Sequence, residues 1–259
     1  MIKVGIIGGS GLDDPKLLED FKEISVETKY GKPSSTLTCG KLAGVDVVIL
    51  SRHGKGHTIY PTGVNFRANI AALKQHGCTH ILATTACGSL REEIEPGHLV
   101  FPDQFIDWTK HRTLTFHDEK VIHTQMAEPF CNELRKLLGK TAAELKLPYH
   151  GQGTVITIEG PRFSTKAESN MFRGWNADII NMSTVPEVIL AREAGICYQA
   201  IAMSTDYDCW REGEEPVTWN MIVERMKQNS DNVKRLLLNT IPKIKSEKCS
   251  CNENVAEIL

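Results

Sequence analysis

The sequence lacks the features of a membrane or nucleic-acid-binding protein. It has no run of about 18 or more apolar residues, and Met1–Ile7 leads into a glycine cluster instead of a secretion signal, so we expect a cytoplasmic protein. Neither sign of charge predominates, because 30 Lys and Arg oppose 32 Asp and Glu. A nucleic acid or a membrane surface would require a sustained basic excess, so neither is expected as a partner. A small anionic ligand needs only one or two local positive charges and stays compatible with this balance.

Internal repeats, low-complexity linkers and breaks in composition are also missing. A chain of 259 residues matches one α/β domain, since such domains often reach about 250 residues. We therefore predict one catalytic domain over residues 1–245 and a C-terminal tail over 246–259. The stretch from Lys243 to Asn254 is polar, and we expect it to be loosely attached.

Short apolar runs alternate with helical patterns, which predicts an α/β fold with a largely parallel or mixed sheet. The predicted strands are Val4–Ile7, Val45–Leu50, His80–Thr84, Leu99–Phe101, Val155–Ile158, Ile179–Ile180 and Tyr198–Met203. The predicted helices are Asn65–His76, Pro129–Leu147, Val185–Ala194 and a long final helix that begins at Pro216.

Six of the eight cysteines are scattered along the chain, as packed cytosolic thiols are: Cys39, Cys78, Cys87, Cys131, Cys197 and Cys209. Cys249 and Cys251 differ, because a single serine separates them near the C-terminus. A bridge between them would close a strained and readily reduced ring, and a free pair of exposed thiols fits the sequence equally well.

A glycine cluster, Gly8–Gly11, follows the first predicted strand. The dinucleotide fingerprint does not fit, because its third glycine would stand at Asp14, and no Gly-Lys-Ser/Thr follows for a Walker loop. A tight turn and a phosphate cradle both remain open for this segment.

A basic loop, Arg52–His57, follows the second predicted strand. Arginine offers a bidentate fork to phosphate oxygens, and histidine adds a donor whose charge can change. His53 and His57 have the spacing that binds zinc on a helix, but Gly54 and Gly56 oppose a helix, so we predict no metal site. A solvated basic loop is the alternative.

Small and hydroxyl-bearing residues, Thr84–Ser89, end the third predicted strand and suit close approach to an oxyanion. Ser89 is outside a Gly-x-Ser-x-Gly elbow, and Cys87 has no sequence sign of an activating base, so neither is predicted as a nucleophile. Three successive strand ends of this kind favour a binding site over ordinary turns.

Thr157–Ser164 forms another strand exit. Phe163 can stack on a heteroaromatic base, whereas Glu159 and Arg162 fit a structural ion pair better than catalysis. Further along, Ser183 either caps the next helix or contacts an anion or sugar. Met182 offers apolar surface to a sugar ring or packs in the core.

Two carboxylates, Asp206 and Asp208, follow the last predicted strand. Such a pair can share a proton, because like charges raise one of the two pKa values. A 6-aminopurine offers a donor at N6, and its N7 needs a proton as the base departs. An isolated Asp-x-Asp is commonly a turn or a metal site, but beside these strand ends it favours base recognition.

These motifs occur in the order found in the S-methyl-5′-thioadenosine phosphorylase family of trimeric purine nucleoside phosphorylases, which the chain resembles over residues 2–242. The matching segments are 5–11, 52–54, 85–90, 103–107, 126–131, 159–164, 185–188 and 205–208. The resemblance implies a single-domain nucleoside phosphorylase fold, with a mixed, distorted, barrel-like sheet flanked by helices. It also implies a homotrimer or a dimer of trimers.

The implied activity is reversible phosphorolysis of methylthioadenosine to adenine and 5-methylthioribose 1-phosphate in purine and methionine salvage. Phosphate is a co-substrate, and no cofactor is expected. The implied phosphate ligands are Ser10, Arg52, His53, Thr85, Ala86 and Ser183. The implied nucleoside contacts are Met182, Phe163, Ser164, His57, His123, Trp219 and Ile222. Asp206 would protonate or hydrogen-bond N7, and Asp208 would accept from N6.

Some positions depart from the family pattern. Trp219 replaces a small residue near the 5′-alkylthio pocket, where it either narrows the pocket or packs aside on the last helix. Ser10 and Ser183 keep the hydroxyl of the usual threonine. His123 would act across a subunit boundary. The tail pair of cysteines resembles the Cys-x-Cys of archaeal relatives, where it is linked to disulfide handling or heat resistance.

Three alternatives accompany this interpretation: an adenosine or 6-oxopurine phosphorylase, a nucleoside hydrolase, and a silent purine-binding protein. Asp206 and Asp208 favour a 6-amino base, and Arg52 and His53 favour phosphate over water.

Overall fold

A computed structural model describes residues 2–8, 17–213, 218–245 and 249–252. Its eleven strands form one mixed sheet in the order β2-β3-β4-β1-β5-β10-β9-β7, with β11 paired to β5, β6 to β11 and β8 to β6. The strands are β1 Lys3–Gly8, β2 Glu19–Ile24, β3 Leu37–Leu42, β4 Val45–Ser51, β5 His80–Ser89, β6 Leu99–Val100, β7 Gln104–Trp108, β8 Tyr149–His150, β9 Thr154–Ile158, β10 Ile179–Asn181 and β11 Cys197–Asp206.

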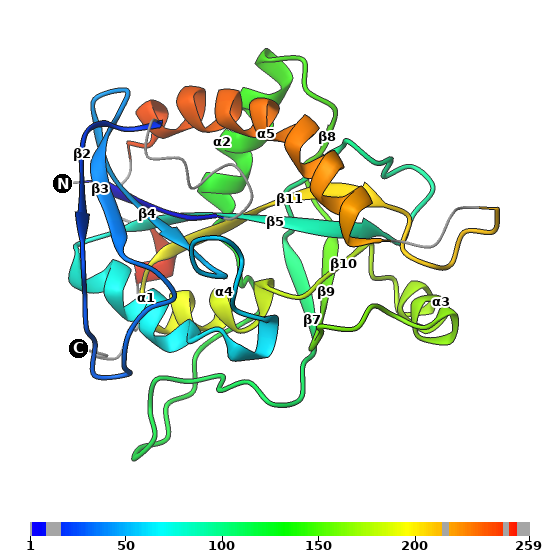
Figure 1. The fold of residues 1–259 in the computed structure, drawn as a ribbon, viewed down its shortest axis with the longest axis horizontal. Helices are drawn as coiled ribbons and strands as arrows, with labels where there is room; N and C mark the ends of the chain where they lie inside the picture. The colour runs from blue at the N-terminus through cyan, green and yellow to red at the C-terminus, as the bar shows by residue number, and fades with distance from the viewer. Residues whose placement is uncertain (1, 9–16, 214–217, 246–248, 253–259) are drawn as a thin grey trace.

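Helices cover both faces of this sheet (Figure 1). The α-helices are α1 Phe66–Gln75, α2 Asn132–Glu144, α3 Lys166–Gly174, α4 Thr184–Glu193 and α5 Trp219–Thr240, and 3-10 turns span Pro61–Gly63, Ile241–Lys243 and Ser250–Asn252. Helices α1 and α4 pack together on one face, and α2 packs with α5 on the other. Alternate residues of β11 enter the two cores, with Tyr198 on the α1 and α4 side and Ile201 on the α2 and α5 side. This burial on both faces explains why the central strands are continuous apolar runs.

The long strand β5 creates an opening in the sheet. It pairs with β11 along one edge, while the other edge pairs with β1 as far as Ala83 and with β10 only from Gly88. The stretch Thr84–Cys87 between them has β11 as its only strand neighbour among the described residues. Polar backbone and small side chains are therefore presented where neighbouring strands end.

The α/β class and the mixed sheet confirm the prediction, although the sheet does not close into a barrel. All seven predicted strands are present with shifted ends; β5, for example, runs to Ser89. Strands β2, β3, β7 and β8 and helix α3 were not predicted. The predicted helix start at Pro216 lies outside the described residues, and α5 begins at Trp219 after an N-cap in which Thr218 Oγ1 accepts from the Met221 N–H.

The C-terminal segment is more firmly packed than its polar sequence predicts. Ile244 and Cys251 are buried in the core on the α2 and α5 side. An exposed pair of tail thiols is therefore wrong for Cys251, whereas Cys249 is half-buried. The division into residues 1–245 and 246–259 stays a prediction. Within the described residues, no helix combines the length and apolar character needed to cross a membrane.

Candidate active site

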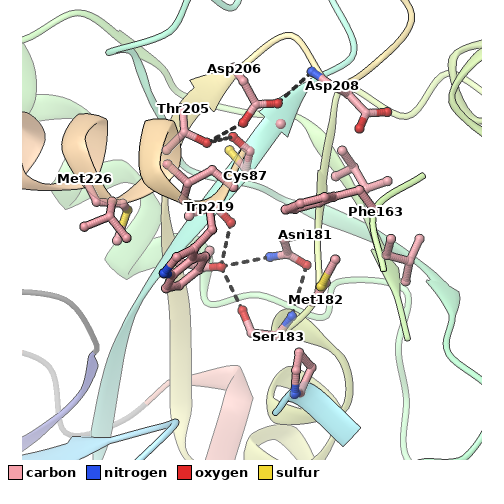
Figure 2. Close-up of a pocket in the computed structure, with 18 of the residues that line it drawn as sticks. Cys87, Phe163, Asn181, Met182, Ser183, Thr205, Asp206, Asp208, Trp219 and Met226 are labelled. Carbon is pink, nitrogen blue, oxygen red and sulfur yellow. Dashed lines mark hydrogen bonds between the residues drawn. The ribbon is translucent and has the colours of Figure 1, made fainter. Parts of the chain in front are cut away.

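A pocket lies at the opening beside β5, where the ends of β5, β10 and β11 meet the first turns of α5. Figure 2 shows Asp206 and Asp208 at one end of it and Ser183 with Asn181 at the other. We call the first the aspartate end. We call the second the arginine end and define it by Arg52, His53, Thr85, Ala86 and Ser183, which all line the pocket.

Linked hydroxyl groups form the floor of the arginine end. Thr85 Oγ1 and Ser183 Oγ share a hydrogen bond of 2.7 Å, and Asn181 Nδ2 donates to Thr85 Oγ1 at 3.3 Å. Asn181 is itself fixed, because its Oδ1 accepts from Thr157 Oγ1 at 2.9 Å and its Nδ2 donates to Thr184 Oγ1 at 2.7 Å. Ser183 occupies the N-cap position of α4, but its side chain makes no capping hydrogen bond, so the capping alternative is wrong.

Arg52 is buried, and its guanidinium is held by two groups, Glu187 and the Thr84 carbonyl. Its guanidinium forms a bidentate ion pair with Glu187 of α4, in which the Nη2–Oε2 distance is 2.9 Å. Nη1 donates to the Thr84 carbonyl at 2.9 Å, and the Tyr198 hydroxyl donates to Glu187 Oε2 at 2.9 Å. A positive charge is therefore fixed next to the unpaired edge of β5, and the ion pair with Glu187 offsets its desolvation.

His53 is an uncharged neighbour of this arginine. Its Nδ1 lies 2.8 Å from the Ile59 carbonyl and donates to it, which leaves Nε2 with a lone pair. Burial, followed by the charge of Arg52, lowers the pKa of His53 to about 4. The rings of His53 and His57 lie 4.5 Å apart between centroids, and those of His57 and Trp219 lie 4.8 Å apart. This row of rings leads from the arginine end to the start of α5.

The aspartate end holds the half-buried carboxyl group of Asp206 and the buried one of Asp208. Asp206 Oδ2 accepts from Thr205 Oγ1 at 2.6 Å, and its Oδ1 accepts from the Asp208 N–H at 2.8 Å. Burial raises the pKa of Asp206 against these hydrogen bonds, and the charge of Asp208 adds to the rise. Burial also raises the pKa of Asp208, whose Oδ1 accepts from Ser164 Oγ at 3.3 Å. The surroundings thus favour a carboxyl group that keeps its proton at a higher pH than an exposed carboxyl group does.

Gly88 is required for this close packing of β5 and the aspartates. A Cβ atom at Gly88 would lie 3.1 Å from both Asp206 Oδ1 and Ile180 Cγ2, which is tighter than ordinary contacts between such atoms. Its neighbour Cys87 is buried, and burial raises the pKa of that thiol well above its usual value. Cys87 is therefore a packed thiol, as its sequence setting predicted.

Apolar side chains form the walls between the two ends. Figure 2 shows Phe163 and Met182 on one side and Trp219 and Met226 on the other. Trp219 is 49% exposed and lines the pocket from the first turn of α5, so its side chain does not turn away from the site. The pocket thus joins a basic, hydroxyl-rich end to an acidic end through a largely apolar middle.

Nearly all of the predicted site residues line this one pocket: Arg52, His53, His57, Thr85, Ala86, Phe163, Ser164, Met182, Ser183, Asp206, Asp208, Trp219 and Ile222. Ser10 lies outside the described residues. His123 is exposed and does not line the pocket of its own chain.

The interpretation of Glu159 and Arg162 as one ion pair is wrong. Glu159 pairs with Arg112 at 3.2 Å, and Arg162 pairs with Glu168 at 2.6 Å. Both residues are held structurally, but by other partners. Glu168 also completes a capping box with Thr165 at the start of α3.

Three supporting residues were missed by the sequence reasoning: Asn181, Glu187 and Thr205. Asn181 directly precedes Met182 and Ser183, and Thr205 directly precedes Asp206. Their position beside predicted site residues was the only signal. Glu187 is 135 residues from Arg52 along the chain, and no local pattern links the two.

Comparison with known proteins gives concordant matches. The model of the Phosphorylase superfamily matches residues 3–242. An S-methyl-5′-thioadenosine phosphorylase of Xenopus tropicalis is 59% identical over 250 residues, which cover 94% of this chain and 89% of the relative. One from Thermofilum pendens is 51% identical over 260 residues, which cover 100% and 98%. The solved structure of methylthioadenosine phosphorylase from Schistosoma mansoni with adenine is 45% identical, covers 94% of this chain and 92% of that one, and gives a TM-score of 0.91.

Proposed function

Because the chain belongs to the Phosphorylase superfamily and, within it, to the S-methyl-5′-thioadenosine phosphorylases, we propose that it cleaves methylthioadenosine with phosphate. The products are adenine and 5-methylthioribose 1-phosphate, and the reaction is reversible. The enzyme is thus a pentosyltransferase. One observation carries the assignment: a fixed arginine among hydroxyl groups and a pair of carboxyl groups, of which Asp206 has a raised pKa, face the same pocket.

Phosphate binds at the arginine end in this proposal. Arg52 supplies the fixed positive charge, while the hydroxyls of Thr85 and Ser183 and the backbone at Ala86 supply hydrogen-bond donors. Nε2 of neutral His53 accepts a hydrogen bond from a protonated phosphate oxygen, or it takes up a proton and donates to the phosphate dianion. Ser10 is proposed as a further phosphate ligand on the strength of the family resemblance alone.

The nucleoside spans the remaining pocket. Adenine lies toward Phe163 and Ser164 with its N7 at Asp206 and its N6 amino group donating to Asp208. The ribose lies against Met182, and the 5′-methylthio group reaches His57, Trp219 and Ile222.

The reaction then follows from the charges at the two ends. As the C1′–N9 bond breaks, its electron pair passes to the base and the sugar becomes an oxocarbenium-like cation. A phosphate oxygen stabilises that cation and bonds to C1′ from the opposite face, with inversion. Protonated Asp206 gives its proton to N7, so adenine leaves as a neutral molecule. The raised pKa of Asp206 is what this step requires.

The assembly and setting form part of the proposal. We propose a homotrimer in the cytoplasm that acts in purine and methionine salvage without a cofactor. Exposed His123 would then reach the 5′ end of the nucleoside in a neighbouring subunit.

A second substrate, adenosine, is favoured by one observation. A relative 44% identical to this chain is a phosphorylase named for both adenosine and methylthioadenosine. The test compares kcat/KM at saturating phosphate for methylthioadenosine, adenosine, methylthioinosine and inosine. We expect methylthioadenosine to be the best substrate, adenosine next and both 6-oxopurines poorest, because ionised Asp208 repels O6. A 6-oxopurine nucleoside as the best substrate would contradict the assignment.

A further inference from the structure

Four cysteines from three distant segments meet outside the pocket. Cys131 occupies the N-cap position of α2, and Cys197 begins β11. Cys251 lies in the last 3-10 turn, and Cys249 directly precedes that turn. Their sulfur atoms all lie within 4.8 Å of one another. Cys131 lies 118 residues before Cys249 along the chain, and Cys197 lies 52 residues before it. Folding therefore brings the set together, and no local sequence pattern unites it.

The spacing of the sulfurs matches that around a tetrahedral metal ion. Cys131 and Cys249 are 3.8 Å apart, and Cys249 and Cys251 are 3.5 Å apart. A disulfide would place two sulfurs about 2.05 Å apart. Four thiolates at about 2.3 Å from a zinc ion have neighbouring sulfurs about 3.8 Å apart. The cluster thus has the size of a zinc coordination shell.

The surroundings also suit a structural metal. Cys131, Cys197 and Cys251 are buried in the apolar core on the α2 and α5 side. Cys249 and Cys251 also line a cavity with Arg192, Lys136, Glu128 and Glu133, and Lys136 pairs with Glu133. An ion can therefore reach the sulfurs from a polar cavity. None of the four cysteines lines the candidate active site, so this cluster is separate from the proposed catalysis.

We propose that Cys131, Cys197, Cys249 and Cys251 bind one zinc ion. Binding replaces the four thiol protons by four sulfur–zinc bonds and moves no electrons. Sulfur-only tetrahedral sites favour zinc among the common divalent ions, and all four positions are filled by protein, as in structural sites. The ion would fasten the C-terminal segment to α2 and β11. This departs from the expectation of no metal, which considered only the histidines of the Arg52–His57 loop.

The test uses the full chain, kept reduced, incubated with excess zinc and then desalted. We expect about one zinc per chain by elemental analysis, and addition of a chelator should increase the number of thiols that react with a thiol reagent. Cobalt in place of zinc should give sulfur-to-cobalt charge-transfer bands and the intense visible bands of tetrahedral coordination.

Variants separate the cluster from other thiols. Cys249→Ser/Cys251→Ser should lose the bound zinc, and chelator should no longer lower its Tm. Cys39→Ser, which alters a half-buried thiol outside the cluster, should keep both properties.

Three results would overturn the proposal: no stoichiometric zinc in the reduced chain, cobalt spectra without sulfur ligation, or full zinc binding by the double variant. The chain purified without reductant could instead be lighter by four hydrogen atoms, and its reduced form could take up no zinc. That result would assign the four cysteines to two disulfides. Metal content and spectra do not depend on turnover, so these outcomes are independent of the proposed phosphorolysis.

Discussion

The two ends of the pocket treat charge in different ways. At the aspartate end, burial raises the pKa of Asp206, which favours the protonated form of this acid. In the arginine end, burial and the charge of Arg52 lower the pKa of His53, so that this base stays neutral. Arg52 is more deeply buried than either group, and it keeps its charge because Glu187 pairs with it. The comparison teaches that burial favours the neutral form of a group unless an opposite charge is paired with it.

Replacing the proton donor of the aspartate end should have the largest effect. Asp206→Asn keeps the size and a hydrogen bond to N7 but cannot transfer a proton, so kcat/KM for methylthioadenosine should fall about 10²–10⁴-fold. Stability should change little. Asp178→Asn, at an aspartate paired with Arg91 outside the pocket, is the matched control. Near-normal phosphorolysis by Asp206→Asn would remove Asp206 from the mechanism.

Breaking the ion pair of the arginine end should separate stability from phosphate binding. Arg52→Met leaves Glu187 buried without its partner, which should lower the free energy of unfolding by about 3–5 kcal/mol. Arg52→Met/Glu187→Gln removes that charge and should recover most of the stability. Both should raise the KM for phosphate roughly 10–100-fold, since a charged hydrogen bond contributes about 1.5–3 kcal/mol.

Denaturant titration and phosphate kinetics measure these two effects separately. Arg67→Met breaks a more exposed pair with Asp118 and should cost less than about 1 kcal/mol. Recovery of phosphate binding in the double variant would show that Arg52 does not hold the anion.

The pH dependence of stability should have opposite signs at the two ends. His53 has a folded pKa of about 4, below its unfolded value, so the unfolded chain binds more protons and stability falls as pH drops from about 6.5 toward 4. The pKa of Asp206 is raised in the folded chain, so its contribution is lost as pH rises above about 4.

Unfolding by urea at several pH values checks these signs. His53→Asn should lose about 2 kcal/mol less than the wild-type chain between pH 7 and pH 4.5. His111→Gln, at an exposed histidine, is the control. An unchanged acid slope in His53→Asn would contradict the neutral histidine.

A substitution in the apolar wall between the two ends of the pocket should have the smallest effect on activity. Trp219→Val removes the ring beside His57 and should change the ratio of kcat/KM for methylthioadenosine to that for adenosine by about 10-fold or less. Trp175→Val, outside the pocket, should leave the ratio unchanged. An unaltered ratio in Trp219→Val would show that this ring does not contact the 5′ group.

The sequence predicted the buried strands and the site residues that stand at the ends of those strands. Central strands such as β5 and β11 are largely apolar because both faces are covered, and the polar residues at their ends converge on one pocket. Edge strand β2 escaped prediction because most of its residues are exposed and polar. Helix α3 is short, although the capping box of Thr165 and Glu168 was a usable signal.

Long-range partners could not be predicted in the same way. The ion pair of Arg52 with Glu187 and the hydrogen bond of Thr85 with Ser183 join segments 135 and 98 residues apart. Local sequence patterns contain no record of such pairing. The same limit explains why Cys131 and Cys197 were interpreted as isolated packed thiols, whereas folding brings them beside Cys249 and Cys251.

The central claim is that the arginine end delivers phosphate while the aspartate end releases the base. The most direct test follows adenine release from methylthioadenosine by the wild-type chain, dialysed free of phosphate and then supplied with it, and identifies the sugar product by phosphorus NMR. We predict release only with phosphate, and one 5-methylthioribose 1-phosphate for each adenine. Equal release without phosphate, with free methylthioribose as the product, would contradict the account.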